Sequence, residues 1–296
     1  MSQRVETTHR TVLSARRLRG RAVAFGALFA SALLFGGVAV AGKGASYASI
    51  QNAINSGNPS SIVGEVERAE KLPCGSCIDL VRPLIDHENA RVRDVAAWWL
   101  AKRSIRLQVR DEMFERLAGT DTIRARNAAE VLGRFAHPDA LMALEIAMHE
   151  DALGDEARVA AATAIGAIGH PAGKAMLEAG LDSESAAVRA AAAAALRNIR
   201  GNTEGAALVE VLSDADDRVV QEAVRTLGAV REALAVEALV AVIEDETRPV
   251  FVRRDAAWAL GKIGDGAARD VLERVVAEDP DMLVRGAARS ALAALR

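Results

Sequence analysis

The sequence predicts an all-α fold, a right-handed α-solenoid of about seven stacked helical hairpins. The segment VRRDAAWALGKIG at residues 252–264 is similar to VRDVAAWWLAKR at residues 92–103, and further copies of the segment lie between the two. No segment alternates apolar and polar residues in the way that a half-buried strand does. A repeat of this kind indicates stacked helical units, because a single hairpin cannot bury its apolar face alone.

The first segment, residues 1–41, is predicted to be a signal peptide or an N-terminal membrane anchor. It has a basic head with six Arg, twenty residues without a charge, and an Ala39-Val40-Ala41 exit before Gly42. These three features are typical of a bacterial secretory signal. An uncleaved anchor stays open, since twenty apolar residues can span a bilayer. Either way we expect the rest of the chain to be periplasmic or secreted, and anchored in the inner membrane if the leader is not cleaved.

The second segment, residues 42–76, is predicted to be a helical N-terminal cap. SYASIQNAI and SSIVGEVERAEKL read as two helices separated by the turn NSGNP,. The first unit of a repeat array is often atypical, because one of its sides has no neighbour.

The third segment, residues 77–296, contains seven copies of the repeat. We take the second residue of each copy as its register position: Arg93, Ala125, Arg158, Arg189, Val220, Arg253 and Arg285. Three residues on, every copy has Ala, and seven residues on, every copy has Leu or Ile. Together with the residues at −1 and +10, these positions share one face of a helix. A second amphipathic run precedes each copy, so each period is predicted to be helix, turn, helix, turn.

The phrase VRRDAAWALGKIGDGAARDVL resembles the short HEAT-like repeat, of the kind also found in phycobilisome lyases. The resemblance covers about residues 77–296 and implies a HEAT-like or ARM-like superhelix. It says little about function, because such repeats serve many proteins.

A ladder of structural ion pairs is predicted from the register column. Arg stands there in five copies, and an acid stands seven residues before each of those Arg residues. The alternative is that acids simply favour helix starts. The predicted pairs are Arg93 with Asp86, Arg158 with Asp151, Arg189 with Asp182, Arg253 with Glu246, and Arg285 with Glu278.

The cysteines, Cys74 and Cys77 in LPCGSC, are the only two in the chain. In an oxidising compartment they are predicted to form a short structural disulfide. A redox-active pair at a helix start and a metal site are the alternatives. Haem attachment is excluded, because Ile78 stands where a CxxCH motif needs His.

A candidate partner-binding strip lies five residues past the register. This column holds Trp98, Glu130, Arg225 and Trp258. A column that accepts Glu and Arg must reach solvent, and exposed aromatic residues are favoured anchors at interfaces. Partial burial of both Trp residues against neighbouring repeats is the alternative. Trp99, in a column of small and apolar residues, is predicted to be core.

Two His-Glu pairs, His87-Glu88 and His149-Glu150, are similar to the iron-binding pairs of deoxyhypusine hydroxylase, a HEAT-like enzyme. In that family the pairs lie inside the repeat helix, whereas here they fall near the turns, so we interpret them as turn residues. No Gly-rich phosphate loop, nucleophile elbow or catalytic triad is recognisable. No catalytic residue, metal or cofactor is therefore predicted.

Charge argues against nucleic acid as a partner. The whole chain has a net charge of −3, but beyond residue 41 it carries 31 Lys and Arg against 39 Asp and Glu. Phosphate-backbone binding needs clustered basic side chains. The sequence therefore predicts an exported, non-enzymatic scaffold with protein partners, touching a membrane only through its leader. A redox-linked accessory protein using Cys74 and Cys77, and a lyase or chaperone for a cofactor, are the alternatives.

Overall fold

The computed structural model describes residues 45–295, and every regular element among them is helical. The chain divides into two units, Met1–Ala41 and Gly42–Arg296, and all the described residues belong to the second unit. The predicted leader lies outside the described residues. None of the helices described has the length and apolar character that crossing a membrane requires.

Two helices precede the repeats, α1 (Tyr47–Asn55) and α2 (Pro59–Arg68). Both begin at the positions that the sequence favours: Ser46 caps α1, and Asn58 caps α2 immediately before Pro59,. Trp99 joins this pair to the first repeat, because its indole Nε1 donates to the carbonyl of Ala69 at 3.0 Å. The division into a cap and a solenoid at residue 76 stays a prediction.

Seven helical hairpins follow, and the predicted α-solenoid is confirmed. The helices of these hairpins pair in chain order. They are α3 (Cys77–Val81) with the short η1 (Arg82–Asp86) before α4 (Ala90–Leu100), then α5 (Arg106–Leu117) with α6 (Thr122–Phe135), α7 (Leu141–His149) with α8 (Gly154–Ile168), α9 (Gly173–Gly180) with α10 (Ala186–Leu196), α11 (Ala206–Glu210) with α12 (Asp217–Val230), α13 (Val236–Glu244) with α14 (Val250–Ile263), and α15 (Arg269–Glu278) with α16 (Met282–Ala294). Short 3₁₀ turns, Pro138–Ala140, Asp151–Leu153, Val211–Ser213, Ala233–Ala235 and Gly266–Ala268, lie between or at the ends of these helices.

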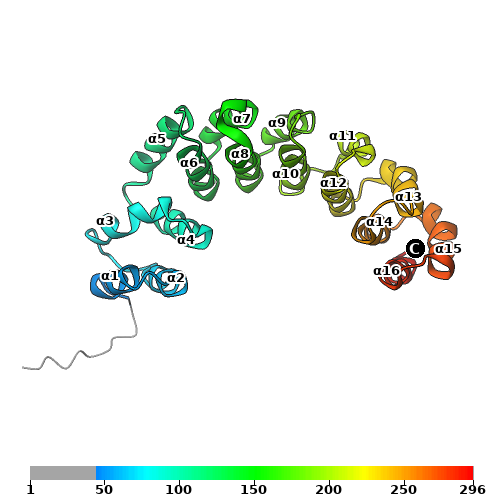
Figure 1. Cartoon of the computed structure of the whole chain (residues 1–296), viewed down its shortest axis with the longest axis horizontal. Coiled ribbons are helices and arrows are strands. Elements are labelled where there is room, and N and C mark those ends of the chain that lie inside the picture. The colour runs from blue at the N-terminus through cyan, green and yellow to red at the C-terminus, as the bar shows by residue number, and fades with distance from the viewer. Residues whose placement is uncertain (1–44, 296) are drawn as a thin grey trace, which may run out of the picture. The chain divides into compact units, whose positions relative to one another are not determined.

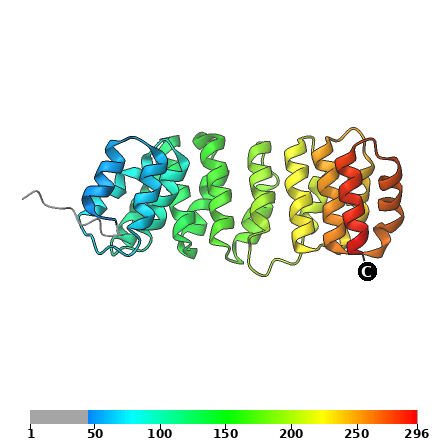
Figure 2. The ribbon, with the colours of Figure 1, turned by 90° about the horizontal axis from the view of Figure 1, so that it is seen from below.

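Within this unit the hairpins stand in a single curved row (Figure 1). The second helices of the hairpins, α4 to α16 by even numbers, line the inner side of the curve, and the first helices lie outside. Seen from below, the helices run side by side in the order of the sequence (Figure 2). Each second helix therefore contacts its own first helix and the second helices of its neighbours.

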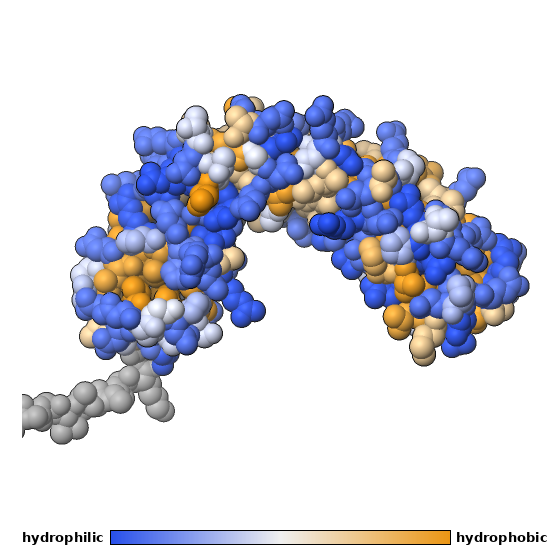
Figure 3. All heavy atoms as spheres, viewed as in Figure 1, coloured by the Kyte–Doolittle hydropathy of each residue, from blue (hydrophilic) through white to orange (hydrophobic). Residues whose placement is uncertain are grey.

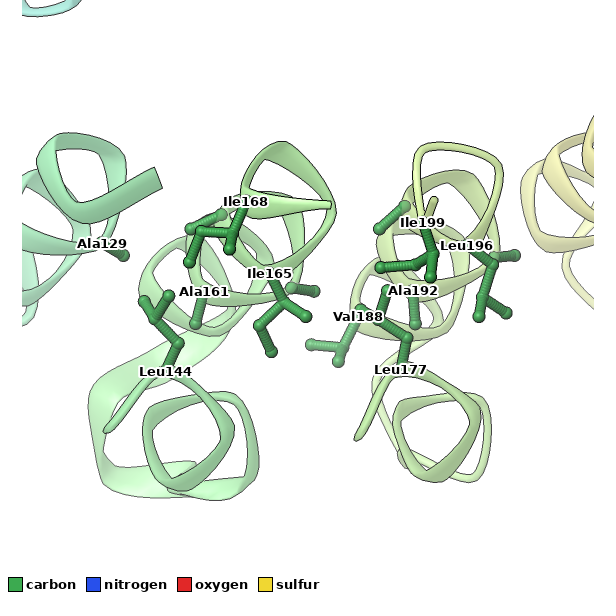
Figure 4. Close-up of a cluster of buried hydrophobic side chains, with 14 of the residues drawn as sticks. Ala129, Leu144, Ala161, Ile165, Ile168, Leu177, Val188, Ala192, Leu196 and Ile199 are labelled. Atoms are coloured by element: carbon green, nitrogen blue, oxygen red, sulfur yellow. The ribbon is translucent and has the colours of Figure 1, made fainter. Parts of the chain in front are cut away.

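The repeated apolar columns form the core. All seven Ala residues three positions past the register are fully buried, which confirms that the column faces a close contact. Figure 4 shows how the columns fit together: Ile165 of α8 and Val188 of α10 point into the space between neighbouring repeats, while Leu144 and Leu177 reach up from the first helices. A continuous core results, in which each hairpin covers the apolar side of the next.

Four helices end at a residue in the left-handed conformation, which is Gly in α8 and α14 but Ala136 in α6 and Arg231 in α12. Gly169 and Gly264 end α8 and α14 with positive φ angles of 63° and 77°, which a residue without Cβ adopts easily,. Asp279-Pro280 has the form of an N-cap followed by a first-turn proline, but Asp281 is the N-cap of α16,. Asp279 lies at the end of α15, where its carboxylate accepts from the backbone N–H of Asp281.

Four glycines set the spacing between second helices. Each lies eight residues past its register and packs against the Ala six residues past the next register. A Cβ on Gly166 would lie 2.7 Å from the Cβ of Ala195, closer than two carbon atoms can approach. The pairs are Gly133 with Ala164, Gly166 with Ala195, Gly228 with Ala259, and Gly261 with Ala291. The step from α10 to α12 has Arg197 and Thr226 at these positions, and there the Thr226 hydroxyl donates instead to the carbonyl of Ala193.

Candidate functional site

The inner face of the second helices carries a series of shallow grooves. A groove of about 670 Å³ lies over α4, α6 and α8, and one of about 600 Å³ lies over α8, α10 and α12. Val159 lines both of them. Two more, of about 340 Å³ and 450 Å³, lie on either side of Trp258 towards the C-terminus. The hollow that these helices border is open in Figure 3.

The column five residues past the register reaches this face, as the sequence predicts. Trp258 is 42% exposed, whereas Trp98 is half-buried against the core. Glu130 is held by Arg93, whose Nε and Nη2 donate to its carboxylate at 2.7 and 2.8 Å. Arg225 is half-buried and extends towards α14. Whether these four residues bind a partner stays a prediction.

Asp255 is the charged centre of the C-terminal part of this face. Its carboxylate accepts from Gln221 and Arg225 at 2.8 Å and from Arg254 at 2.7 Å. Burial alone would raise the pKa of Asp255, but these hydrogen bonds and the charge of Arg225 bring it below its ordinary value,. The carboxylate therefore stays charged at neutral pH and fixes two guanidinium groups at the groove edge.

The predicted ladder of ion pairs is wrong in its partners. Of the five pairs, the structure forms only Arg158 with Asp151, at 2.8 Å. Asp86 instead binds Arg116 at 2.8 Å and the side-chain amide of Asn127 at 3.0 Å. Within residues 45–295, Asp182, Glu246 and Glu278 form no ion pair with Arg189, Arg253 or Arg285. In Arg93, Arg189 and Arg285 the Nη1 group donates instead to backbone carbonyls five and six residues earlier, so it is not directed at the acid seven residues earlier.

Arg93 and Arg189 instead link their own turn to the next repeat. Arg189 donates from Nη1 to the carbonyls of Ser183 and Glu184 in its own turn, and from Nε to Asp214 of the following repeat at 2.7 Å. Arg93 binds its own turn carbonyls, and Arg285 does the same. For three register Arg residues the partner in the following repeat lies six residues before that repeat's register: Arg158 binds Ser183, Arg189 binds Asp214, and Arg253 lies 3.6 Å from Asp279.

Cys74 and Cys77 form a disulfide in the structure, with their Cα atoms 5.2 Å apart. Cys77 is fully buried at the start of α3, and Cys74 Sγ accepts the backbone N–H of Cys77 at 3.2 Å. The bridge closes a tight turn at the end of the segment that connects α2 to the first hairpin.

The two His-Glu pairs do not come together. His87 follows η1 and accepts the backbone N–H of Asn89 on its Nδ1 at 2.9 Å, while His149 ends α7 two repeats further on. Among residues 45–295 no group of three or more His, Cys, Asp or Glu side chains is placed to hold a metal ion. The side chains of this part of the chain therefore do not fit the iron site that the resemblance to deoxyhypusine hydroxylase implies.

Comparison with known proteins identifies the repeats and corrects the predicted function. A family model described as HEAT repeats matches residues 110–197, 152–224 and 205–293. Deoxyhypusine hydroxylase-B of Oryza sativa subsp. japonica is 38% identical over 90 residues, which are 30% of this chain and 30% of the relative. Deoxyhypusine hydroxylase of Arabidopsis thaliana is 34% identical over 97 residues, which are 33% and 31%. The chain thus matches about a third of the length of these relatives.

A solved structure agrees on the fold. The X-ray structure of the Escherichia coli protein YibA aligns with 82% of this chain and 90% of its own, at a TM-score of 0.53 and 17% identity. That likeness concerns the fold alone. The prediction of a non-enzymatic scaffold is wrong, because the curated relatives are enzymes, and neither the redox nor the lyase alternative matches them.

Proposed function

We propose that the inner face of this chain, which belongs to the HEAT-repeat family, binds an extended polypeptide. In this proposal the protein is related to the deoxyhypusine hydroxylases, and its inner face holds the polypeptide substrate. One observation carries the proposal: all four inner-face grooves are lined by second helices and follow one another along the row. Curved helical stacks present extended binding surfaces of this kind.

The chemistry of the groove over α4, α6 and α8 suits a peptide backbone with mixed side chains. Apolar Val159 lies between charged rims, and the rims are formed by ion pairs across neighbouring repeats. Arg126 binds Glu156 at 2.8 Å, and Arg134 binds Asp94 at 3.2 Å. Such exposed pairs are worth little by themselves and open at little cost when a ligand offers its own polar groups. The acidic balance of the chain beyond residue 41 disfavours nucleic acid in the same place,.

A matched pair of substitutions tests this proposal. Val159→Arg places a long side chain in both grooves, whereas Met142→Arg makes the same kind of change on the outer helix α7, where Met142 is 62% exposed. Polypeptides selected on the full chain from a random peptide library are the probe, and their Kd is measured by fluorescence anisotropy. We expect Val159→Arg to weaken binding by at least about tenfold and Met142→Arg to leave it unchanged. The reverse pattern would place the binding surface on the outer face.

The reaction named by the relatives is assayed separately. The full chain is incubated in air with deoxyhypusine, ferrous iron and a reductant, and incorporation of one oxygen atom from O2, the other leaving as water, is followed by mass spectrometry. Hydroxylation would show that this chain shares the activity of the deoxyhypusine hydroxylases as well as part of their sequence. Peptide binding without hydroxylation would mean that the chain shares only the binding surface with these enzymes. That outcome would be consistent with the separation of His87 from His149. We assign no reaction step to residues of this chain.

We also propose that the chain is exported and that residues 1–41 are its leader. The basic, apolar and Ala-Val-Ala segments support export, and so does the disulfide between Cys74 and Cys77, since disulfides persist in oxidising compartments,. The motif VRRDAAWALGKIG supports the finer proposal that the repeats are of the phycobilisome-lyase kind. Cell fractionation with N-terminal sequencing tests export: a protein in the cytoplasmic fraction that begins at residue 1 or 2 would rule it out.

A further inference from the structure

The same Trp-Lys pair occurs twice on the inner face, at the same place in two repeats. Trp98 and Lys102 lie on or just beyond α4, and Trp258 and Lys262 on α14, in each case five and nine residues past the register. Residues four apart are neighbours on a helix surface. Lys102 Nζ lies 3.9 Å from the ring centroid of Trp98, and Lys262 Nζ lies 5.6 Å from that of Trp258. Both pairs therefore combine an aromatic face with a nearby positive charge.

The first pair already holds a carboxylate from the chain itself. Glu70, just beyond α2, forms an ion pair and a hydrogen bond with Lys102. Trp98 beside it is half-buried against the core. The pair at the end of α4 thus shows what such a site accepts: an acidic side chain delivered by an adjoining segment.

The second pair has the same groups with no carboxylate on the ammonium. Within residues 45–295 no acidic side chain forms an ion pair with Lys262, and Trp258 is 42% exposed. Both side chains line the groove of about 450 Å³ between α14 and α16, together with Arg254 and Ser290. The indole presents a flat apolar surface, and the ammonium presents unused donors beside it.

The surroundings of Trp258 are positively charged. Arg197 and Arg225 line the groove of about 340 Å³ on its other side. The local acids are already engaged: Glu222 binds Arg197 and Arg225, and Asp255 binds Arg225 and Arg254. Four cationic side chains thus face two carboxylates, and a third carboxylate would complement the remaining charge.

We propose that Trp258 and Lys262 form a recognition site for an acidic segment of a protein partner, with a Glu or Asp carboxylate on the Lys262 ammonium and an adjoining apolar side chain on the indole of Trp258. This inference rests on the proposed function, since it names the kind of polypeptide that the C-terminal part of the inner face takes. The occupied pair at Trp98 and the net positive charge around Trp258 are the two observations that carry it.

The test uses synthetic peptides and two matched Lys variants of the full chain. The probes are an acetylated, amidated peptide of alternating Leu and Glu and its counterpart of alternating Leu and Gln, each labelled for anisotropy. Lys262→Met keeps the apolar stem and removes the charge, and Lys102→Met does the same at the occupied pair. Circular dichroism checks that both variants stay folded, which their exposed positions favour.

We expect the Glu peptide to bind at least about tenfold tighter than the Gln peptide, and Lys262→Met to remove that preference while Lys102→Met retains it. Trp258→Leu should weaken both peptides, and added salt should weaken only the Glu peptide. Equal binding of the two peptides, or an unchanged preference in Lys262→Met, would overturn the inference.

The test separates this inference from the proposed function. If library-selected polypeptides still depend on Val159 while the Glu peptide shows no preference, the acidic site falls and the inner-face binding surface stands. If Val159→Arg leaves all peptide binding intact, the binding surface along α6, α8 and α10 falls. The Trp258 site then stands only if Lys262→Met still removes the preference for the Glu peptide.

Discussion

Arg189 Nε donates to the carboxylate of Asp214 over 2.7 Å, and this contact joins the turn of one repeat to the turn of the next. The Asp214 side chain is 9% exposed and that of Arg189 is 19% exposed, so the pair is shielded from water. Because Nη1 of Arg189 also binds two turn carbonyls, one side chain satisfies groups in two hairpins. Bidentate Arg-carboxylate contacts of this kind are among the stronger hydrogen bonds in proteins.

Arg189→Ala should lower the free energy of unfolding by about 2 kcal/mol, because it leaves a shielded carboxylate and two carbonyls without their donor. Urea denaturation followed by circular dichroism measures the change. Asp182→Ala is the control, since Asp182 is exposed and forms no ion pair with Arg189 in residues 45–295. An equal loss in both variants would favour the pairing predicted from the sequence.

Asp214→Asn should make stability less sensitive to acid. The Arg189 hydrogen bond lowers the pKa of Asp214 below its ordinary 3.8. A carboxyl whose pKa is lower when folded stabilises the protein above its unfolded pKa, and this contribution is lost as the pH falls through the folded pKa. Melting temperatures between about pH 6 and about pH 2 should therefore fall more steeply for the wild type than for the variant. If the melting temperatures of the wild type and the variant fell equally with pH, the ion pair of Asp214 with Arg189 would not contribute to the acid sensitivity of the fold.

Gly166→Ala should destabilise the protein by about 1–3 kcal/mol, because the new methyl group would overlap Ala195 and push α8 and α10 apart,. Gly64→Ala in α2 is the matched control. Nothing lies within 4 Å of a Cβ at Gly64, so the gain in helix propensity should stabilise by about 0.5–1 kcal/mol,. In thermal unfolding we expect Gly166→Ala to lower the melting temperature and Gly64→Ala to raise it. Stabilisation by both substitutions would show that α8 and α10 tolerate a wider spacing.

Reduction of the disulfide should cost about 2 kcal/mol at most, because its loop is short and little chain entropy is recovered,. The Cys74→Ser variant should show the same loss and no further response to reductant. Cys77→Ser should cost more, since it places a hydroxyl in a fully buried site,. Thermal melts with and without dithiothreitol measure all three. A wild type unaffected by reductant would show that packing around Cys77 alone holds the loop.

The periodic part of the fold could be predicted from the sequence, because a residue buried in every repeat leaves a column. The Ala column and Trp99 are predicted in this way, and both are fully buried. Contacts between repeats were harder, because the partner lies at a different offset in the next copy. Asp214 stands six residues before its register rather than seven, and that offset identifies the acceptor of Arg189.

The glycine contacts were missed, although the sequence holds a signal for them. Gly recurs eight residues past the register in four copies, and in each case the next copy has Ala six residues past its own. Each of the two columns by itself looks like an ordinary small-residue position, and the relation becomes visible only when the Gly column of one copy is compared with the Ala column of the next. The Trp258 site likewise depends on which Lys is already engaged, and the contact between Glu70 and Lys102 cannot be read from the sequence of the repeat.

The glycine contacts also decide which repeats are interchangeable. A hairpin duplicated or moved within the array repeats the glycine contact on both sides only if a glycine before it meets its alanine and its own glycine meets an alanine after it. The hairpin of α7 and α8 carries both Ala164 and Gly166, so it could be copied in tandem without a misfit. The hairpin of α9 and α10 has Ala195 but Arg197, so a tandem copy of it would lack the glycine contact between the two copies.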